Sequence, residues 1–554
     1  MLTSHNFAFL LLLLTSSLAA FTPGGPTVQL DSATFTGVAN GTLNKFLGIP
    51  YVKPPVGPLR LHLPQPIPRY TKNFAATAYG PICPQQAQTL VLPDDVPEIV
   101  REEFAGIGGP APLPSSEDLQ KKMKVDRLTV NVIAPASATP HSKLPVVVWI
   151  YGGGFETGFP ASTDGSILVN QSIALGSPIV YVSLNYRLNV FGFLASKEVR
   201  DAGIGNLGLH DQRQALRWVQ QYITQFGGEP SKVTLWGESA GAISTSLQMV
   251  TNGGNNEGLF RAAIMDSGAP LWLGDITHGQ QYYDQIVKDV GCERSRDTLD
   301  CLRNVPFEAL MSATNSTPNL FVYQALAEAW IPRVDGDFLK DDPQRLFMRG
   351  SVANIPMING VNDDEGTLFS ASTLNITTPD ELTLYLKTYY VPGAFIAEID
   401  HVLSFYPSDP AAGSPFNTSD ENALTPQFKR IAAVLGDLAF QGPHRLFLQT
   451  RSDLQPTWSY LYKRGKATPF LGAFHSIELD NAYGGGDLGA FFIRFVATLD
   501  PSEPNAAVKW PRYTTKSPDM LTFLDSAVPL AVTQDDYRVE AIQAMIELLL
   551  KHPY

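Results

Sequence analysis

A series of short, almost continuously hydrophobic segments constrains the fold of this chain more than any other feature. They are rich in β-branched residues, and six of them read LPVVVWIY, SPIVYVSLNY, KVTLWG, AAIMDSG, NIPMING and TWSYLYK. Such segments are typical of strands that are buried on both faces of a parallel sheet. Helical patterns lie between several of them, as in DQRQALRWVQQYITQF at 211–226. This alternation predicts an α/β fold with a large, mostly parallel central sheet flanked by helices.

The residues before these segments predict a smaller element. The stretch TVQLDSATFTGVANGTLNKFLGIPY alternates apolar and polar residues on either side of Asn40-Gly41, a favoured two-residue hairpin turn. We therefore expect a small antiparallel sheet near the N-terminus. The chain has no internal repeat and no low-complexity linker, and 44% of its residues are hydrophobic, which is ample for a large core. Residues 21–554 are expected to form a single domain.

The N-terminal residues predict export from the cell. Phe7 to Leu14 form an apolar run that is too short to span a bilayer. Small residues follow it, and cleavage near Ala19 or Ala20 suits a secretory signal peptide over residues 1–20. No later stretch reaches 18 apolar residues. We expect a secreted, extracellular protein without a transmembrane segment.

The modification sites in the sequence fit an oxidising compartment. Cys292 and Cys301 flank eight residues, which makes a local disulfide plausible, and Cys83 is then a free thiol or a partner for another chain. Sequons of the form N-x-[ST] are candidate glycosylation sites. There are five of them, beginning at Asn40, Asn170, Asn315, Asn375 and Asn417.

Charge and motifs exclude several classes of partner. The formal net charge is −13, and the chain contains no run of five basic residues, so nucleic acid is not an expected partner. The three cysteines cannot build a metal cluster, and no H-E-x-x-H pattern occurs. We expect neither a metal nor a cofactor.

Reactive side chains follow several of the predicted strands. In α/β proteins the functional groups gather where strands end and helices begin. The segment KVTLW runs into Gly237-Glu238-Ser239, and the small residues AGAIS follow. A serine on a sharp strand-to-helix turn projects from the sheet and, with a base beside it, becomes a nucleophile. The alternative is a glycine-punctuated turn with an uninvolved serine. The reactive residues that follow the other predicted strands favour the interpretation of Ser239 as a nucleophile.

The acid and the base are expected downstream of Ser239, because enzymes with a nucleophile on such a turn order nucleophile, acid and histidine along the chain. Among the later histidines, His475 alone follows a buried strand, in a loop bounded by Gly472. The segment NDDEGTLF follows another strand and offers Glu365, with Asp363 and Asp364 as competitors. Glu365 is nearest to the glycine, where the chain can turn inward. One buried carboxylate is needed to orient the imidazole.

The strand VVVWIY ends in a run of three glycines, Gly152 to Gly154. Glycine backbone lets a tetrahedral centre approach its N–H groups without a Cβ clash, as stabilisation of an oxyanion requires. A phosphate-binding loop is excluded, since no G-K-[ST] follows.

These motifs resemble those of the type-B carboxylesterase/lipase family of α/β-hydrolases, and the match covers nearly the whole chain after residue 20. It includes FLGIPYVKPPVGPLRL, VVVWIYGGGFETG, SLNYRLNVFGFL, NDDEGTLF and LGAFHSIEL. The resemblance implies a secreted esterase or lipase that hydrolyses hydrophobic esters, and it is closest in look to the fungal lipases. It implies Ser239 as nucleophile, Glu365 as acid and His475 as base. The N–H groups of Gly153, Gly154 and Ala240 would be the oxyanion donors.

The chain departs from the family pattern near its N-terminus. Cys83 matches one half of a family disulfide, but Arg127 stands where the second cysteine would align. The first family disulfide is therefore expected to be absent, while Cys292–Cys301 matches the second. In the lipases the loop at about 84–126 carries a lid, and its DDVPEIVREEF stretch has apolar residues at helical spacing. The alternatives are a mobile lid acting at a lipid–water interface and an ordinary surface helix packed on the body.

Two other functions are compatible with the same fold. A choline-ester hydrolase would hold its cation on an aromatic face, but residues 84–126 contain neither Trp nor Tyr. A non-catalytic adhesion protein would lack part of the triad and carry a membrane anchor. The sequence favours neither alternative. The preferred ester and the oligomeric state stay open.

Overall fold

The structure is a computed structural model that describes residues 24–88, 101, 127–503 and 508–553. The predicted signal peptide at 1–20 lies outside the described residues, as does most of the lid-like loop at 84–126.

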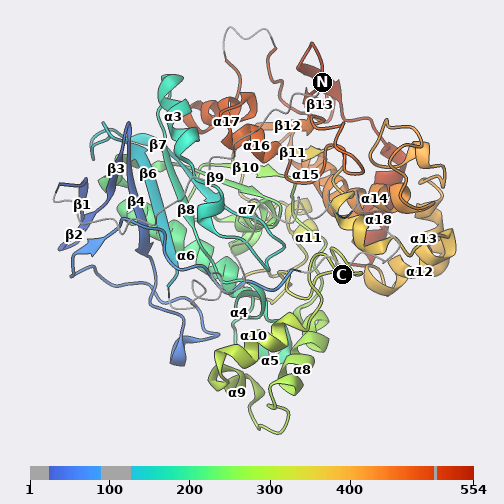
Figure 1. The fold of residues 1–554 in the computed structure, drawn as a ribbon, viewed down its shortest axis with the longest axis horizontal. Coiled ribbons are helices and arrows are strands. Elements are labelled where there is room, and N and C mark those ends of the chain that lie inside the picture. Colours follow the sequence, from blue (N-terminus) through green and yellow to red (C-terminus); the bar gives the residue numbers. More distant parts are fainter. Residues whose placement is uncertain (1–23, 89–100, 102–126, 504–507, 554) are drawn as a thin grey trace, which may run out of the picture.

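A large twisted sheet forms the centre of the described part of the chain (Figure 1). It has eleven strands, in the order β14 (Leu530–Gln534), β13 (Asp519–Phe523), β12 (Thr457–Tyr462), β11 (Met357–Asn362), β10 (Ala262–Asp266), β9 (Gly228–Glu238), β7 (Leu144–Ile150), β8 (Val180–Leu184), β6 (Thr129–Pro135), β4 (Leu43–Pro50) and β3 (Val38–Asn40). From β8 to β13 all neighbouring strands are parallel. The edges are antiparallel. The predicted mostly parallel sheet is confirmed.

All six hydrophobic segments form strands of this sheet, as β7 to β12. Every residue of β8, β10, β11 and β12 is buried. This explains why these segments lack polar alternation: helices cover the sheet on both faces, so neither face meets water.

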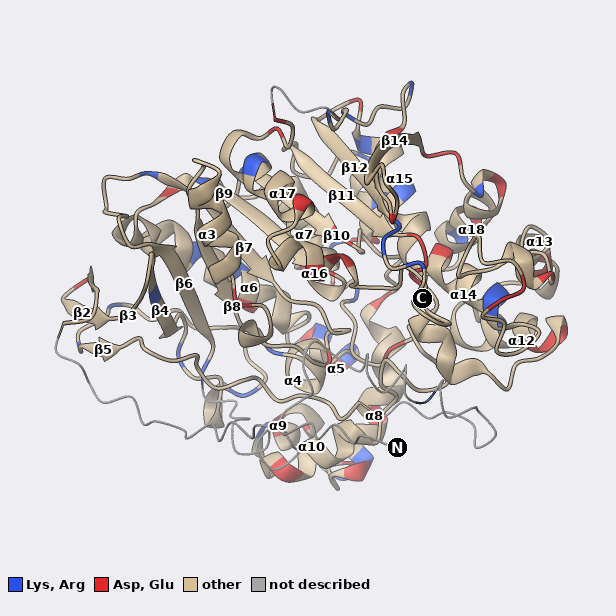
Figure 2. Cartoon of the chain, turned by 45° about the horizontal axis from the view of Figure 1, so that its top comes forward, with Lys and Arg blue, Asp and Glu red and all other residues tan. Residues whose placement is uncertain are grey.

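Two layers of helices enclose the sheet. Helices α3 (Ser166–Ala174) and α17 (Asp487–Thr498) pack on one face, and α6 (Leu207–Tyr222), α7 (Ala240–Val250) and α15 (Gly442–Arg451) pack on the other (Figures 1 and 2). The helical pattern predicted at 211–226 corresponds to most of α6 and the 3₁₀ turn at Ile223–Phe226. The other α-helices of the described ranges are α4 (Asn189–Phe193), α5 (Lys197–Asp201), α8 (Gln280–Asp289), α9 (Thr298–Asn304), α10 (Phe307–Asn315), α11 (Pro343–Met348), α12 (Pro379–Tyr389), α13 (Ile396–Leu403), α14 (Phe428–Gly436), α16 (Glu478–Tyr483) and α18 (Val539–Lys551).

The N-terminal region forms two hairpins rather than one. Strands β1 (Thr27–Leu30) and β2 (Ala33–Thr36) pair antiparallel, and β5 (Phe74–Ala75) joins β2 in parallel to complete the small sheet. Strands β3 and β4 form the second hairpin and extend the edge of the large sheet. Its turn is Gly41-Thr42 and not the predicted Asn40-Gly41, because Asn40 pairs with Leu43. The φ of +60° at Gly41 fits this turn.

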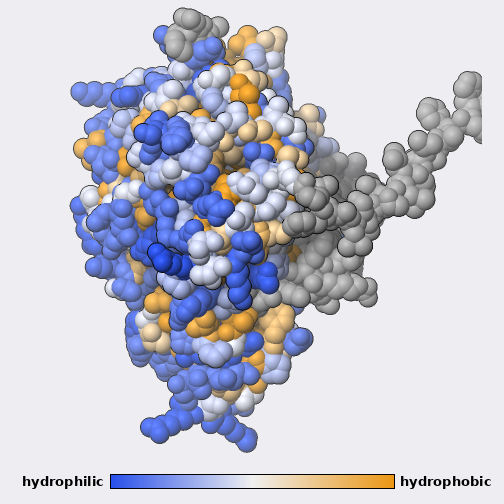
Figure 3. Space-filling model, turned by 90° about the vertical axis from the view of Figure 1, so that its left-hand side faces the viewer, coloured by the Kyte–Doolittle hydropathy of each residue, from blue (hydrophilic) through white to orange (hydrophobic). Residues whose placement is uncertain are grey.

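Polar residues cover the outside of the described chain. The strands at the centre of the large sheet are largely free of charge, and basic and acidic residues are interspersed over the helices and loops (Figure 2). The face seen in Figure 3 is mainly hydrophilic, with small separate apolar patches. Within the described ranges no helix is long and apolar enough to cross a membrane.

The cysteines are arranged as expected. Cys292 and Cys301 are joined by a disulfide, and Cys83 is free and buried. Arg127, which stands where the second cysteine of the family disulfide would align, is exposed.

Candidate functional site

Ser239 lies on a sharp turn between β9 and α7. Its φ of 54° and ψ of −127° are uncommon for a residue with a side chain. The Ser239 N–H donates to the carbonyl of Asp266 at the end of β10 (2.9 Å), which ties the turn to the next strand. The small residues around it permit this geometry: a Cβ on Gly241 would lie 1.9 Å from the carbonyl oxygen of Ile150. The turn therefore presents the Ser239 hydroxyl above the sheet, part-exposed.

His475 and Glu365 complete a hydrogen-bonded chain with this serine. Ser239 Oγ lies 2.8 Å from His475 Nε2, and His475 Nδ1 lies 2.6 Å from Glu365 Oε2. The other carboxylate oxygen of Glu365 accepts from the N–H of Asn362 (2.7 Å). With the proton on Nδ1, the ring donates to Glu365 and accepts from the serine hydroxyl. This arrangement can take a proton from Ser239 and hold the charge that results.

The two acids beside Glu365 have other partners. Asp364 anchors the loop that carries His475, since its Oδ2 accepts from the N–H of Ala473 (2.8 Å) and its own N–H donates to the Ala473 carbonyl (3.0 Å). Asp363 forms ion pairs with Lys463 and Lys466. Of the three candidate acids, the structure brings Glu365 to the imidazole.

Burial and charge act in opposite directions on the imidazole. Burial alone would lower the pKa of His475, but the charge and hydrogen bond of Glu365, together with the charge of Glu238, raise the pKa above its usual value. Phe369 and Phe440 flank the ring, with centroids 5.2 and 4.6 Å away. The imidazole is thus almost fully buried, and in a buried setting its carboxylate partner has a strong effect on it.

The glycine run after β7 lies against the serine. A Cβ on Gly152 would fall 2.8 Å from the Cβ of Ser239. Gly154 and Ala240 line the same pocket as Ser239, and Gly153 links Gly152 to Gly154. Ala240 is the first residue of α7, so its N–H has no partner within the helix. The predicted oxyanion donors are therefore grouped around the serine.

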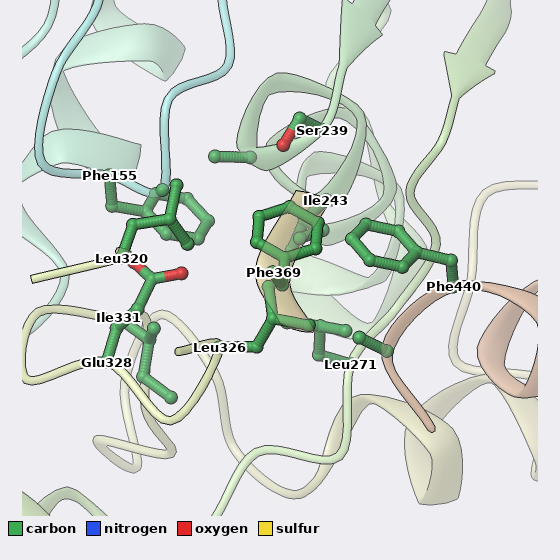
Figure 4. A pocket seen from close by; sticks show the side chains of 13 residues that line it. Phe155, Ser239, Ile243, Leu271, Leu320, Leu326, Glu328, Ile331, Phe369 and Phe440 are labelled. Carbon is green, nitrogen blue, oxygen red and sulfur yellow. The ribbon is translucent and has the colours of Figure 1, made fainter. Parts of the chain in front are cut away.

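A hollow with about 440 Å³ of empty space, part of it open to solvent, lies beside Ser239 (Figure 4). Most of its wall is apolar: Phe155, Ile243, Leu271, Leu320, Leu326, Ile331, Phe369, Ala439 and Phe440. Such a wall suits a hydrophobic group better than a charged one. Among the described residues, no group of His, Cys, Asp or Glu side chains is placed to hold a metal ion.

Several buried acids near the site were missed in the sequence. Glu238 Oε1 lies 3.3 Å from His475 Nε2 and accepts from Ser476 Oγ. Asp266 and Glu478, both fully buried, lie near enough to Glu238 for its charge to act on them. Burial raises the pKa of Glu238 and of Glu478, and that of Asp266 to about 8. The position of Glu238, next to Ser239 in G-E-S-A-G, was the one available signal.

Comparison with known proteins places this geometry in a family. The profile of the carboxylesterase family matches residues 25–541. The chain is 42% identical over 509 residues to secreted lipase 1 of Botryotinia fuckeliana (strain B05.10), with 88% of each chain covered. It is 40% identical over 549 residues to lipase 4 of Diutina rugosa, with 96% of this chain and 98% of that protein covered.

The fold has a counterpart among solved structures. The crystal structure of Aspergillus niger EstA superposes with a TM-score of 0.80 and 26% sequence identity, over 96% of this chain and 99% of that one. The resemblance to an α/β-hydrolase is thereby confirmed. This chain belongs to the carboxylesterase family and is a carboxylic ester hydrolase.

Proposed function

We propose that the chain hydrolyses esters by acyl transfer through Ser239, with His475 as base and Glu365 as acid. The observation that carries this proposal is the unbroken contact from Ser239 Oγ to His475 and from His475 to Glu365, at 2.8 and 2.6 Å. Serine alone is a weak nucleophile, and a histidine oriented by a carboxylate is the group that activates it.

The reaction has two stages. In the first, Ser239 Oγ attacks the ester carbonyl while its proton passes to His475 Nε2. The N–H groups of Gly153, Gly154 and Ala240 stabilise the oxyanion, and each such donor is worth about 3–4 kcal/mol in comparable sites. His475 then gives the proton to the leaving alcohol. In the second stage His475 takes a proton from water, which attacks the acyl-enzyme. His475 then returns this proton to Ser239 Oγ as the carboxylic acid leaves.

The substrate is a hydrophobic ester, presented at a lipid–water interface. The apolar wall beside Ser239 supports this, as do the relatives that are named lipases. Hydrolysis of 4-nitrophenyl esters from acetate to palmitate, below and above the concentration at which each ester aggregates, tests it. A jump in rate on aggregation is expected. Preference for acetate and no jump would contradict the lipid assignment.

Substitution of Ser239 by alanine tests the mechanism. We expect Ser239→Ala to lower kcat by at least about 10⁴-fold with an unchanged circular dichroism spectrum, because the nucleophile is lost and the fold is not. Ser231→Ala, on the exposed start of β9, is the matched control and is expected to keep full activity. A phosphonate ester should label Ser239 in the wild type. Turnover retained by Ser239→Ala would refute the assignment.

The mature protein is a secreted glycoprotein that begins near residue 21. A relative named as secreted supports export, and the five candidate asparagines are all exposed. N-terminal sequencing of protein from the culture medium, with its mass before and after endoglycosidase treatment, tests this. Retention of residues 1–20 and an unchanged mass would contradict it.

A further inference from the structure

One acidic side chain interrupts the apolar wall beside Ser239. Glu328 lines the hollow together with Phe155, Leu320 and Ile331, and its carboxyl group lies between these apolar side chains and faces the hollow (Figure 4). The side chain does not belong to the Ser239–His475–Glu365 chain, and the mechanism above makes no use of it. Only 7% of Glu328 is exposed. A buried carboxyl group in such a setting costs free energy unless it has a partner.

One of the two carboxyl oxygens of Glu328 lacks that partner within the described part of the chain. Its Oε2 is buried without a hydrogen bond there. Glu156 is the neighbouring acid: its Oε2 accepts from the N–H of Leu320 (2.9 Å) and from Gln88 Nε2 (3.0 Å), while its Oε1 also has no partner among the described residues. Burial, and then the charge of Glu156, raise the pKa of Glu328 well above its usual value. A carboxylic acid kept neutral in this way is a hydrogen-bond donor.

The position of Glu328 decides whether it lies beside the acyl half or the alcohol half of an ester substrate. Its Oε2 lies 2.7 Å from the point where a Cβ on Gly154 would stand, so the carboxyl group packs against the glycine loop. The leaving alcohol takes its proton from His475 and therefore lies on the side of that ring. Glu328 contacts the glycine loop, and the charged group that acts on it is Glu156 rather than His475. The group within its reach is then the acyl chain.

We propose that Glu328 is a specificity-determining residue whose carboxyl group donates a hydrogen bond to an oxygen atom on the acyl chain. The enzyme then prefers acyl groups that carry an ether, keto or hydroxyl oxygen close to the ester carbonyl over alkyl groups of the same size. The proposal rests on ester hydrolysis at Ser239. It adds a polar subsite to a pocket whose other walls are apolar.

Isosteric pairs of esters test the subsite. The 4-nitrophenyl esters of methoxyacetic and butanoic acid differ by one oxygen in place of one methylene, as do those of 3-methoxypropanoic and pentanoic acid. For each pair we compare the ratio of kcat/KM in the wild type, in Glu328→Gln and in Glu328→Leu. For each enzyme we take the ratio of kcat/KM between the two esters of a pair. Comparing these ratios between enzymes cancels the intrinsic reactivity of each ester.

We expect the preference for the oxygen-bearing ester to fall at least about tenfold in Glu328→Leu, in one pair or both. The ether loses its donor, and the alkyl chain no longer buries an unpaired polar group. Glu328→Gln keeps an N–H donor of the same shape and should retain most of the preference. Leu326→Ala, in the same wall, enlarges the pocket without changing its hydrogen bonding and should shift both members of a pair alike.

Three results would overturn the proposal. One is a ratio that is the same within about twofold in all three enzymes. Another is an equal loss of preference in Leu326→Ala. The third is a change of preference that is seen only when the ether oxygen lies in the alcohol half of the ester. This is measured by comparing kcat/KM for 2-methoxyethyl acetate and butyl acetate. Loss of all hydrolysis in Ser239→Ala is independent of these results, so failure of the subsite and failure of the mechanism are distinguishable.

Infrared spectroscopy keeps the proposal testable if Glu328→Leu does not fold. A non-hydrolysable methoxyalkyl phosphonate bound to wild-type enzyme should shift the carbonyl band of a protonated carboxyl group, and the band should be missing in Glu328→Gln. The matching alkyl phosphonate should leave the band in place. Equal spectra with the two phosphonates would contradict the hydrogen bond.

Discussion

At the level of single residues, the acids around the His475 imidazole determine how readily the ring takes up a proton. Glu365 contacts His475 Nδ1, whereas Glu238 lies beside Nε2, the atom that faces Ser239. Both carboxylates favour the charged imidazole, which in the proposed mechanism forms each time a proton leaves Ser239 or water. A low-dielectric setting strengthens this effect, and the aromatic rings around His475 provide it.

The charge of Glu238 should be visible in the pH dependence of hydrolysis. His475 must be neutral to act as a base, so kcat/KM rises with pH through the raised pKa of His475. The charge of Glu238 contributes to that rise in pKa. Glu238→Gln removes the charge and should move the acid limb of the kcat/KM profile to lower pH.

Glu540→Gln, at an exposed position at the start of α18, is the control and should leave the limb in place. If the acid limb of the kcat/KM profile keeps its position or moves to higher pH in Glu238→Gln, the charge of Glu238 does not act on the imidazole as proposed.

At the level of secondary-structure elements, the decisive feature is the close approach of α7 to β7 and β9. Gly241 lies against the end of β7, and Gly237 at the end of β9 lies against the carbonyl of Gly241. Any side chain at these positions would push α7 away from the sheet. Since α7 begins immediately after Ser239, its position also sets where the hydroxyl and the Ala240 N–H point.

Substitution of Gly241 by alanine should therefore affect both stability and catalysis. The new Cβ would stand 1.9 Å from the Ile150 carbonyl oxygen, so the backbone must shift. We expect the free energy of unfolding to fall by about 3 kcal/mol, with a loss of kcat. Urea unfolding and 4-nitrophenyl ester hydrolysis measure the two effects.

Gly203→Ala provides the comparison for this test. Gly203 has a positive φ of 64° but open space around its Cβ position, so its substitution should cost about 1 kcal/mol and leave kcat unchanged. If the two variants lose the same free energy of unfolding, close packing of α7 does not explain the requirement for glycine at 241.

At the scale of the whole molecule, a buried ion pair joins regions that are distant in the sequence. Arg187, in the loop after β8, binds the carboxylate of Asp211 in α6 through two contacts of 2.7 and 2.8 Å. Its third nitrogen donates to the carbonyl of His62 in the N-terminal segment (2.8 Å). Both side chains of the pair are at most 1% exposed. The pair thereby fixes the N-terminal segment to the body of the fold.

Breaking this pair should be costly. Asp211→Asn leaves the buried guanidinium without its counter-charge, and we expect a loss of about 3–5 kcal/mol in the free energy of unfolding. Asp341→Asn breaks the pair with Arg349, in which the arginine is 52% exposed, and should cost less than about 1 kcal/mol. Similar urea midpoints for the two variants would show that Asp211 does not stabilise the fold.

Local sequence patterns predict the six central strands, their mostly parallel arrangement and the sharp turn at Ser239. These follow from local patterns: a run without polar alternation requires burial on both faces, and a serine between small residues at a strand end permits a sharp turn. The hairpin turn at Gly41-Thr42 was misplaced by one residue, because register depends on which residues pair across the strands and not on the turn residues alone.

The sequence favours Glu365 among three consecutive acids because it adjoins a glycine, but folding is what brings it to His475 and gathers further acids around the site. Asp363, Asp364 and Glu365 differ little in sequence, but the loop after β11 directs them to lysines, to the backbone of the His475 loop and to the imidazole. Glu328 carries no local signal beyond being one acid in an apolar stretch, and the fold places it against Gly154. Local patterns encode periodicity and turns, whereas the partner and the protonation state of a buried charge depend on neighbours that only folding brings together.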